Sequence, residues 1–279
     1  MSVQPREVFD DGQSTPTTVG EVLRLKPLPH DRFSTEPSST TGRRTIYGGQ
    51  VSAQALRAAS LTVPDDRVAH SMHAYFLRAG DASRPIELSV ERDRDGGRYS
   101  GRRVTATQDD SVIFSMACSF SRPKDGAEFQ AVQLPAVQPP GELATYALNA
   151  SRTFDLEARV PHDPDPWHRW PARLWLRIRD PLPDDPNVRA CGVVFLSDLC
   201  TGLSRAPLVE QAGLLPSLDH AVWLHRAGDP NDWLLVDLNP LATSGGRGVY
   251  SGHIFGERGT LLASLAQESL FDISQDGTR

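Results

Sequence analysis

The chain has 279 residues, of which 29 are Lys or Arg and 35 are Asp or Glu, so its formal net charge is −6 with neutral histidines. With 39% hydrophobic and 23% charged residues, the composition is that of a folded globular protein, which excludes a disordered or collagen-like chain. The mildly acidic balance offers no extensive basic surface, so nucleic acid is excluded as the default partner.

Cysteine usage and the amino terminus indicate the compartment. Cys118, Cys191 and Cys200 match neither the spacing of a zinc site nor a disulfide framework, so we expect a reducing environment and no metal. The amino terminus lacks the apolar segment of a secretory signal, and the longest apolar run, residues 190–196, is too short to cross a bilayer. We therefore expect a soluble cytoplasmic protein without a membrane partner.

The first half of the chain predicts one helix followed by a meander of strands. Residues 1–18 are rich in polar residues and proline, and we expect them to be a flexible lead-in. An Ala-rich stretch at residues 48–60 begins with two glycines and predicts a helix. Alternating or β-rich segments then predict four strands, at residues 68–77, 86–91, 99–106 and 111–120.

The second half repeats this order after a segment rich in Pro, Gly and Gln, residues 123–150, which we interpret as a linker. Asp185 and Pro186 predict the start of a helix that runs to about Cys200, because Asp is a good N-cap and Pro fits the first helical position. Strands are predicted before and after this helix, at residues 154–160, 174–178, 218–225, 233–238, 249–255 and 261–270.

A repeated tetrapeptide supports two copies of one unit. Arg78-Ala79-Gly80-Asp81 is matched 148 residues later by Arg226-Ala227-Gly228-Asp229, and a strand is predicted before each copy. The expected fold class is α+β, with tandem units at residues 19–122 and 151–279. Each unit has a long central helix that is buried against a mostly antiparallel sheet.

Polar residues at positions where the repeat expects apolar ones are the candidate site residues. Gln267 follows Leu261, Ala263 and Leu265 on a predicted core face, where an amide needs partners; a structural glutamine with satisfied hydrogen bonds is an equal alternative. Asp198 lies late in the second predicted helix, either on a solvent-facing stripe or as a buried base. Ser217 opens a predicted strand, and by itself it is typical of an ordinary strand edge.

Several separated motifs together resemble the acyl-CoA thioesterase II family, the TesB-like enzymes. The resemblance runs from about Val19 to Leu270 and is thin between Arg122 and Asp184. It rests on the segments IYGGQVSAQALRAAS, HSMHAYFLRAGD, FLSDL, SLDHAVWLHR and LLASLAQES, which occur in the family's order and spacing.

This resemblance implies a double hotdog fold, in which two helix-in-sheet units are fused in one chain. It also implies hydrolysis of fatty acyl-CoA to fatty acid and CoA, without a cofactor, by a water molecule that an Asp, a Ser or Thr and a Gln bind and activate. By motif these residues are Asp198, Ser217 and Gln267, with Ser217 where many members have Thr. Fused hotdog units of the family commonly associate, so a homo-oligomer, dimer or tetramer, is expected.

Backbone N–H groups of Gly48, Gly49 and Gln50 are candidates for binding the thioester oxygen, because helix amino ends favour negative charge. Glycines needed only for a tight turn into the helix are an equal alternative. An arginine cluster is a candidate for binding CoA phosphates, although a solvated sheet edge is the commoner explanation. Its members are Arg92, Arg94, Arg98, Arg102 and Arg103.

Two other functions remain open from the sequence. One is a hotdog hydratase or dehydratase, which needs an acid–base pair, commonly His with Asp, that the sequence does not offer. The other is a non-catalytic module that binds acyl-CoA, which has no need to keep Asp198, Ser217 and Gln267 together. Cys200 lies close to Asp198, but we interpret it as a buried structural thiol, since no activating His is near in sequence.

Overall fold

A computed structural model describes residues 16–38, 45–162, 170–213 and 215–273. Its α-helices are α1 (Val19–Val22), α2 (Gly48–Ser60) and α3 (Pro186–Ser197). Short 3₁₀ turns occur at Pro140–Glu142, Asn149–Arg152, Gly202–Arg205 and Val209–Gln211. The strands are β1 (Lys26–Leu28), β2 (Arg32–Ser34), β3 (Val68–Phe76), β4 (Glu87–Asp95), β5 (Tyr99–Gln108), β6 (Ser111–Ser121), β7 (Leu156–Arg159), β8 (Arg173–Ile178), β9 (Asp219–Leu224), β10 (Leu234–Ser244), β11 (Arg247–Gly256) and β12 (Leu261–Leu270).

All of these strands belong to one continuous antiparallel sheet of 12 strands, ordered β1-β2-β4-β5-β6-β3-β9-β12-β11-β10-β8-β7. From the centre outward, β3, β6, β5 and β4 in one half are matched by β9, β12, β11 and β10 in the other. The central strands β3 and β9 pair directly, from Ser71 with Trp223 to Tyr75 with Asp219, and so join the two halves. The predicted repeat is therefore a structural one.

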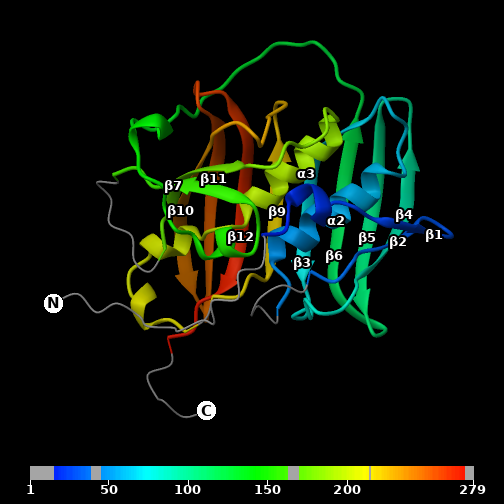
Figure 1. The fold of residues 1–279 in the computed structure, drawn as a ribbon, viewed down its shortest axis with the longest axis horizontal. Coiled ribbons are helices and arrows are strands. Elements are labelled where there is room, and N and C mark those ends of the chain that lie inside the picture. The colour runs from blue at the N-terminus through cyan, green and yellow to red at the C-terminus, as the bar shows by residue number, and fades with distance from the viewer. Residues whose placement is uncertain (1–15, 39–44, 163–169, 214, 274–279) are drawn as a thin grey trace.

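Helices α2 and α3 pack against each other on one face of this sheet (Figure 1). Both are buried on nearly all sides, which explains why their sequences are rich in small and apolar residues. They run antiparallel, because the Oη of Tyr47, the N-cap of α2, donates to the carbonyl of Phe195 in the last turn of α3 at 2.7 Å. The amino end of each helix thus lies beside the carboxyl end of the other.

The linker between the halves passes across the top of the molecule in Figure 1 and then packs on the second half. Trp175, Leu235 and Phe255 face away from the helices and form a small second core, which Leu134 and Val137 of the linker cover. The Nε1 of Trp175 donates to the carbonyl of Gln138 at 3.0 Å. This part of the predicted linker is therefore a packed layer on the outer face of the second half of the sheet.

Several predicted boundaries differ from the structure. Helix α3 ends at Ser197 rather than near Cys200, so that Asp198 is its C-cap, and β9 begins at Asp219, so that Ser217 precedes the strand. The β1–β2 hairpin was not predicted, because its turn contains His30 and Asp31 in the left-handed region, with φ of 62° and 51°, instead of the usual glycine.

The amino-terminal boundary is also informative. Residues 1–15 of the expected flexible lead-in lie outside the described residues, but Thr17 forms a bridge with Phe154. Thr18 caps α1 with its side chain, in a reciprocal pair with Glu21. No helix in the described ranges is long and apolar enough to cross a membrane.

Candidate functional site

A cavity of about 360 Å³ opens where the amino end of α2 meets the carboxyl end of α3. Its polar lining includes Asp198, Ser217 and Arg78. The rest of the lining is mostly apolar and consists of Ile46, Gly48, Val51, Phe76, Leu77, Ala79, Gly80, Ile113, Phe114, Pro216, Leu218 and Leu270, together with Thr45. An apolar pocket with a few convergent polar groups is the usual form of a small-molecule site.

Asp198 owes its place to the end of α3. Its Oδ1 accepts a hydrogen bond from Nε2 of Gln267 at 2.9 Å, and its Oδ2 lies so near Gly48 that a Cβ on that residue would come within 2.6 Å of it. A carboxylate at the carboxyl end of a helix is electrostatically unfavourable for that helix. The adjacent amino end of α2 has the opposite partial charge and favours the anion, so this position is explained by the site and not by the stability of α3.

Ser217 and Gln267 complete the cluster that the sequence predicted. Ser217 forms an isolated bridge with Ser269 just before β9, and its Oγ accepts a short hydrogen bond from Nε2 of Gln267. Gln267, on β12, is only 1% exposed and is not among the residues that line the cavity. It therefore lies behind the other two side chains and connects them through one amide nitrogen.

The three residues of the glycine turn separate in the structure. Gly48 lines the cavity, and a Cβ there would also come within 3.0 Å of Phe76. Gly49 is buried against α3, since a Cβ would lie 2.6 Å from the carbonyl oxygen of Phe195. Gln50, 2% exposed, lines a separate cavity of about 10 Å³. Of the three residues predicted to bind substrate, only Gly48 faces the main cavity, while Gly49 has the packing role weighed as the alternative.

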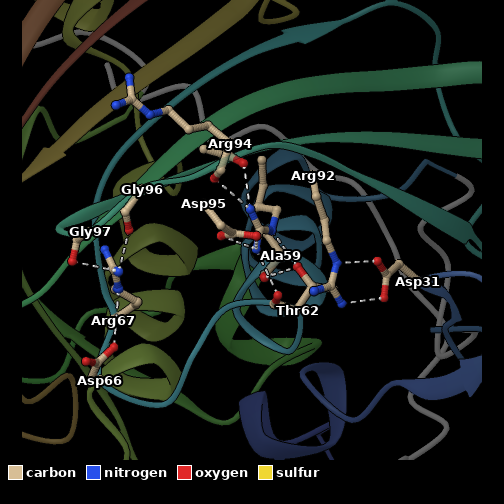
Figure 2. A network of polar contacts seen from close by, with 12 residues as sticks. Asp31, Ala59, Thr62, Asp66, Arg67, Arg92, Arg94, Asp95, Gly96 and Gly97 are labelled. Atoms are coloured by element: carbon tan, nitrogen blue, oxygen red, sulfur yellow. Dashed lines mark hydrogen bonds and ion pairs between the residues drawn. The ribbon is translucent and has the colours of Figure 1, made fainter.

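The arginine cluster does not lie at this cavity. Arg102 is 1% exposed, and its guanidinium donates to the hydroxyl and carbonyl oxygens of Thr62, just beyond the carboxyl end of α2, and to Asp95. Arg92 binds Asp31 through two hydrogen bonds in the same region (Figure 2). Gly48 starts α2 and Thr62 follows its end, so about 20 Å of helix separates the cluster from the cavity. The phosphate-binding interpretation of these arginines has no support in the structure.

Cys200 is a buried thiol, as expected. Burial raises its pKa, and the charge of nearby Asp198 raises it further, so the thiol is not poised to act as a nucleophile. No group of three His, Cys, Asp or Glu residues in the described part of the chain is arranged to hold a metal ion.

Two residues of this region escaped prediction. Arg78 lines the cavity, with its Nη1 bound to the carbonyl of Val112 at 2.7 Å, and the sequence showed it only as part of the repeat. His220 is fully buried beside Gln267, and the sequence showed it only within the segment SLDHAVWLHR, with no role in the site. The signal that would have found His220 is a polar residue on the inner face of β9, the same signal that found Gln267 on β12.

Comparison with protein families assigns both halves of the chain. Residues 35–121 match the model of the acyl-CoA thioesterase N-terminal domain, and residues 123–271 match that of the acyl-CoA thioesterase C-terminal domain. The chain belongs to the acyl-CoA thioesterase family. The resemblance stated from the five sequence segments is thereby confirmed.

Known members of the acyl-CoA thioesterase family match along most of their length. Acyl-CoA thioesterase 2 of Haemophilus influenzae is 32% identical over 91% of this chain and 96% of that protein. Human acyl-coenzyme A thioesterase 8 is 30% identical over 91% of this chain and 89% of its own. The crystal structure of the acyl-CoA thioesterase II TesB2 from Mycobacterium marinum superposes with a TM-score of 0.79 at 34% identity, covering 92% of this chain and 99% of that one. The double hotdog fold is confirmed with it.

Proposed function

We propose that this chain hydrolyses fatty acyl-CoA to a fatty acid and CoA, with Asp198 as the general base for the attacking water. The observation that carries the proposal is the convergence of Asp198, Ser217 and Gly48 on one largely apolar cavity, with Gln267 bound to the first two from behind. The family assignment supports the reaction class, and the cavity supports the assignment of roles.

The reaction needs one proton acceptor and one polarised carbonyl. A water molecule beside Oδ2 of Asp198 loses a proton to the carboxylate as its oxygen attacks the thioester carbon. The tetrahedral intermediate collapses, the carbon–sulfur bond breaks, and the proton held by Asp198 passes to the departing CoA sulfur. Atoms and charge balance without a covalent acyl-enzyme, and Asp198 returns to its ionised form.

Gln267 and Ser217 orient the reacting groups in this proposal. The two N–H groups of the Gln267 amide are directed at Oδ1 of Asp198 and Oγ of Ser217, which fixes Oδ2 toward the cavity. Since Oγ of Ser217 accepts from the amide, its own proton is available to the water or to the developing oxyanion. Gln267 is thus a positioning residue, and Ser217 contacts the reacting atoms.

The amino end of α2 supplies the site for the oxyanion. The first N–H groups of any helix lack partners inside the helix, and they carry partial positive charge. In α2 the side chain of the N-cap, Tyr47, donates to Phe195 and does not cap the helix. Gly48 therefore presents backbone beside Asp198 without a Cβ between them. Donors that are preorganised in this way stabilise the charge that develops on the thioester oxygen.

The lining of the cavity favours hydrolysis over the hydratase alternative. None of the described residues that line the cavity is a histidine, so the His–Asp pair expected of a hotdog hydratase is not formed there. The apolar lining suits an acyl chain, and the guanidinium of Arg78 suits the phosphates of CoA. A binding module would keep this lining but has no use for a carboxylate held beside an uncapped helix end.

Partners and compartment follow from the same proposal. We infer a reducing, cytoplasmic location, supported by three buried cysteines that remain free thiols. Association with further copies of this chain is supported by Tyr75 and Trp223, which are 62% and 40% exposed on the outer face of the central strands β3 and β9. Light scattering of the purified protein measures this directly, and a monomer mass would contradict association.

The deciding experiment is the release of free thiol from acyl-CoA esters of different chain lengths. We expect the wild type to release thiol, and Gln267→Ala to lower kcat about 100-fold, because Asp198 and Ser217 lose their common donor. Gln54→Ala is the matched control, since Gln54 is an equally buried amide on α2 that bonds to the carbonyl of Val22 and lies outside the cavity. Binding of acyl-CoA without release at any chain length would favour the binding module instead.

A further inference from the structure

His220 lies at the back of the candidate site. It is 0% exposed on the inner face of β9, the strand that pairs with β12. The ladder pairs Ala221 with Ala266, so the next residues along, His220 and Gln267, are neighbours, and their side chains interact. The reaction proposed for Asp198, Ser217 and Gln267 does not use His220, although its side chain lies against Gln267.

His220 also contacts α3, directly before Asp198. Its Nε2 lies 2.7 Å from Oγ of Ser197, which in turn lies 2.8 Å from the carbonyl of Val194. The single proton of the Ser197 hydroxyl can therefore serve either the imidazole or the carbonyl. Through these contacts the ring joins the last turn of α3, which positions Asp198, to the amide of Gln267.

Among the buried polar atoms of the described residues that lack a hydrogen bond are Nδ1 of His220 and Oε1 of Gln267. Burial lowers the pKa of His220 to about 4, more than the contact with Gln267 raises it, so the ring is neutral near pH 7 and carries one N–H. If that proton were on Nε2, two lone pairs would face each other in a buried place, which is costly. A proton on Nδ1 satisfies both atoms at once, because Nδ1–H donates to Oε1 and Nε2 accepts from Ser197.

We propose that His220 is a positioning residue, which donates Nδ1–H to Oε1 of Gln267 and so holds the amide with its NH₂ group toward Asp198 and Ser217. A flipped amide would present Oε1 to the Asp198 carboxylate and would repel it. The first unit supports this pairing, since the matching strands β3 and β6 have Met72 opposite Cys118, a pair that cannot form such a bond. Both polar residues therefore occur together in the unit that has the cavity carboxylate.

The test replaces His220 by two different amide side chains, Asn and Gln, and its kinetic part rests on the proposed function. The side-chain nitrogen of His220→Asn stands near Nδ1 and can donate to Gln267, whereas His220→Gln reaches toward Ser197. We expect His220→Asn to keep kcat within about threefold of wild type, and His220→Gln to lower kcat about tenfold or more at unchanged KM, since misdirected positioning groups act on the chemical step. A merely structural role would not separate these two polar, similarly sized replacements in this direction.

Two further measurements complete the test. In a Gln267→Ala background, His220→Gln should have no additional effect on kcat, because the group that it orients is gone. Independently of activity, a two-bond ¹H–¹⁵N correlation spectrum of protein labelled at histidine should place the proton of His220 on Nδ1. An Nε2 proton, or equal losses of kcat in the Asn and Gln variants, would overturn the proposal. Failure of the proposed function has a different signature, which is no thiol release by the wild type, and the spectrum still decides the tautomer in that case.

Discussion

The helix pair has two ends that are related by the internal repeat, and they differ in chemistry. At one end α3 finishes with Asp198, and at the other α2 finishes with Leu61. Where β12 places Gln267 beside Tyr250, the matching strands β6 and β5 place Cys118 beside Arg102. We call the first, which holds the proposed catalytic cluster of Asp198, Ser217 and Gln267, the catalytic end, and the second, defined by Leu61, Thr62, Asp95 and Arg102, the arginine end.

The amino ends of the helices differ in the same way. At the catalytic end α2 begins with Gly48 and has no side-chain cap, while at the arginine end α3 begins with Pro186 and the Asp185 carboxylate accepts from the backbone of Asn187 at 2.8 Å. Asp185 and Pro186 follow the usual rules for a stable helix start. The Asp185 carboxylate accepts from backbone N–H groups that have no partner within the helix, and Pro186 has no N–H group that would need one. The end without a side-chain cap is the one beside the cavity, where its first backbone donors can reach a bound molecule.

At the arginine end, the equivalent position of the fold holds a network of structural polar contacts. Buried Arg67 donates to the carbonyl oxygens of Gly96 and Gly97 and contacts Asp66, while Thr62 and Asp95 lie within one network of polar contacts (Figure 2). Carbonyl oxygens and carboxylates surround the guanidinium groups, and the network ties the end of α2 to the sheet. If the proposed function holds, one of the two duplicated positions serves reactivity and the other serves stability.

Removing the carboxylate of the catalytic end should have the largest effect. We expect Asp198→Asn to lower kcat for acyl-CoA by about 10²- to 10⁴-fold, which is what a positioned general base contributes. The midpoint of thermal unfolding should hardly change, since α3 gains nothing from an anion at its carboxyl end. Asp95→Asn at the arginine end is the control and should keep kcat. Normal turnover by Asp198→Asn would remove Asp198 from the mechanism.

The opposite behaviour is expected at the arginine end. Arg102→Met leaves Thr62 without its donor and should lower the free energy of unfolding by about 3 kcal/mol, measured by urea titration, because a buried charged network loses its centre. The folded fraction should keep the kcat of the wild type. Arg103→Met is the control, as Arg103 is 58% exposed in its ion pair with Asp93 and should cost less than about 1 kcal/mol. A loss of kcat in folded Arg102→Met would break the division between the two ends.

A single methyl group at the start of α2 should sharpen the comparison. The Cβ of Gly48→Ala would lie 2.6 Å from Oδ2 of Asp198, so the carboxylate must move, and we expect kcat to fall about 10- to 100-fold. Stability should fall by about 1 kcal/mol or more, because the new contacts with Asp198 and Phe76 outweigh the helix propensity of Ala. Gly97→Ala at the arginine end has open space around its Cβ and should change neither quantity. Unchanged kcat in Gly48→Ala would show that Oδ2 need not occupy its present place.

The smallest effect expected is on the pH dependence of stability. Burial lowers the pKa of His220 from 6.5 to about 4, so between these values the unfolded chain binds a proton that the folded chain excludes, and stability falls as the pH falls. Between about pH 8 and about pH 5.5 this ring should account for about 1.4 kcal/mol of lost stability. His220→Asn should lack this loss, while the contributions of His70, His225 and His253, whose pKa values burial also lowers, cancel in the comparison. The same dependence of stability on pH in the wild type and in His220→Asn would contradict this prediction.

The sequence alone predicted the features that depend on the local residue pattern and on the internal repeat. The helices at residues 48–60 and 186–197 follow from composition and from a proline at the first helical position, and Gln267 stood out because the repeat has Cys118 there. The convergence of Asp198, Ser217 and Gln267 was expected through the family resemblance, and their mutual contacts needed the fold.

The misses have physical reasons of the same kind. Arg102 looked like part of a solvated edge because nothing in its own strand shows that Thr62, far along the chain, receives its guanidinium. The backbone N–H of Gln50 was expected to bind the thioester oxygen, but it donates to the carbonyl of Tyr47 at 3.1 Å, a contact that the sequence does not show. His220 required knowledge of which atoms lacked partners, and only the structure supplies that.

The single peptide that carries both halves has an evolutionary consequence. In a symmetric dimer of identical units, each substitution occurs at both ends, so an acid that serves catalysis at one would also burden the other. In this protein the segment with Leu134 and Val137 joins the two halves in one chain, so each half has its own coding sequence and can change independently of the other. Asp198 could therefore be acquired without a second carboxylate at Leu61, and each end of the helix pair could diverge under its own selection.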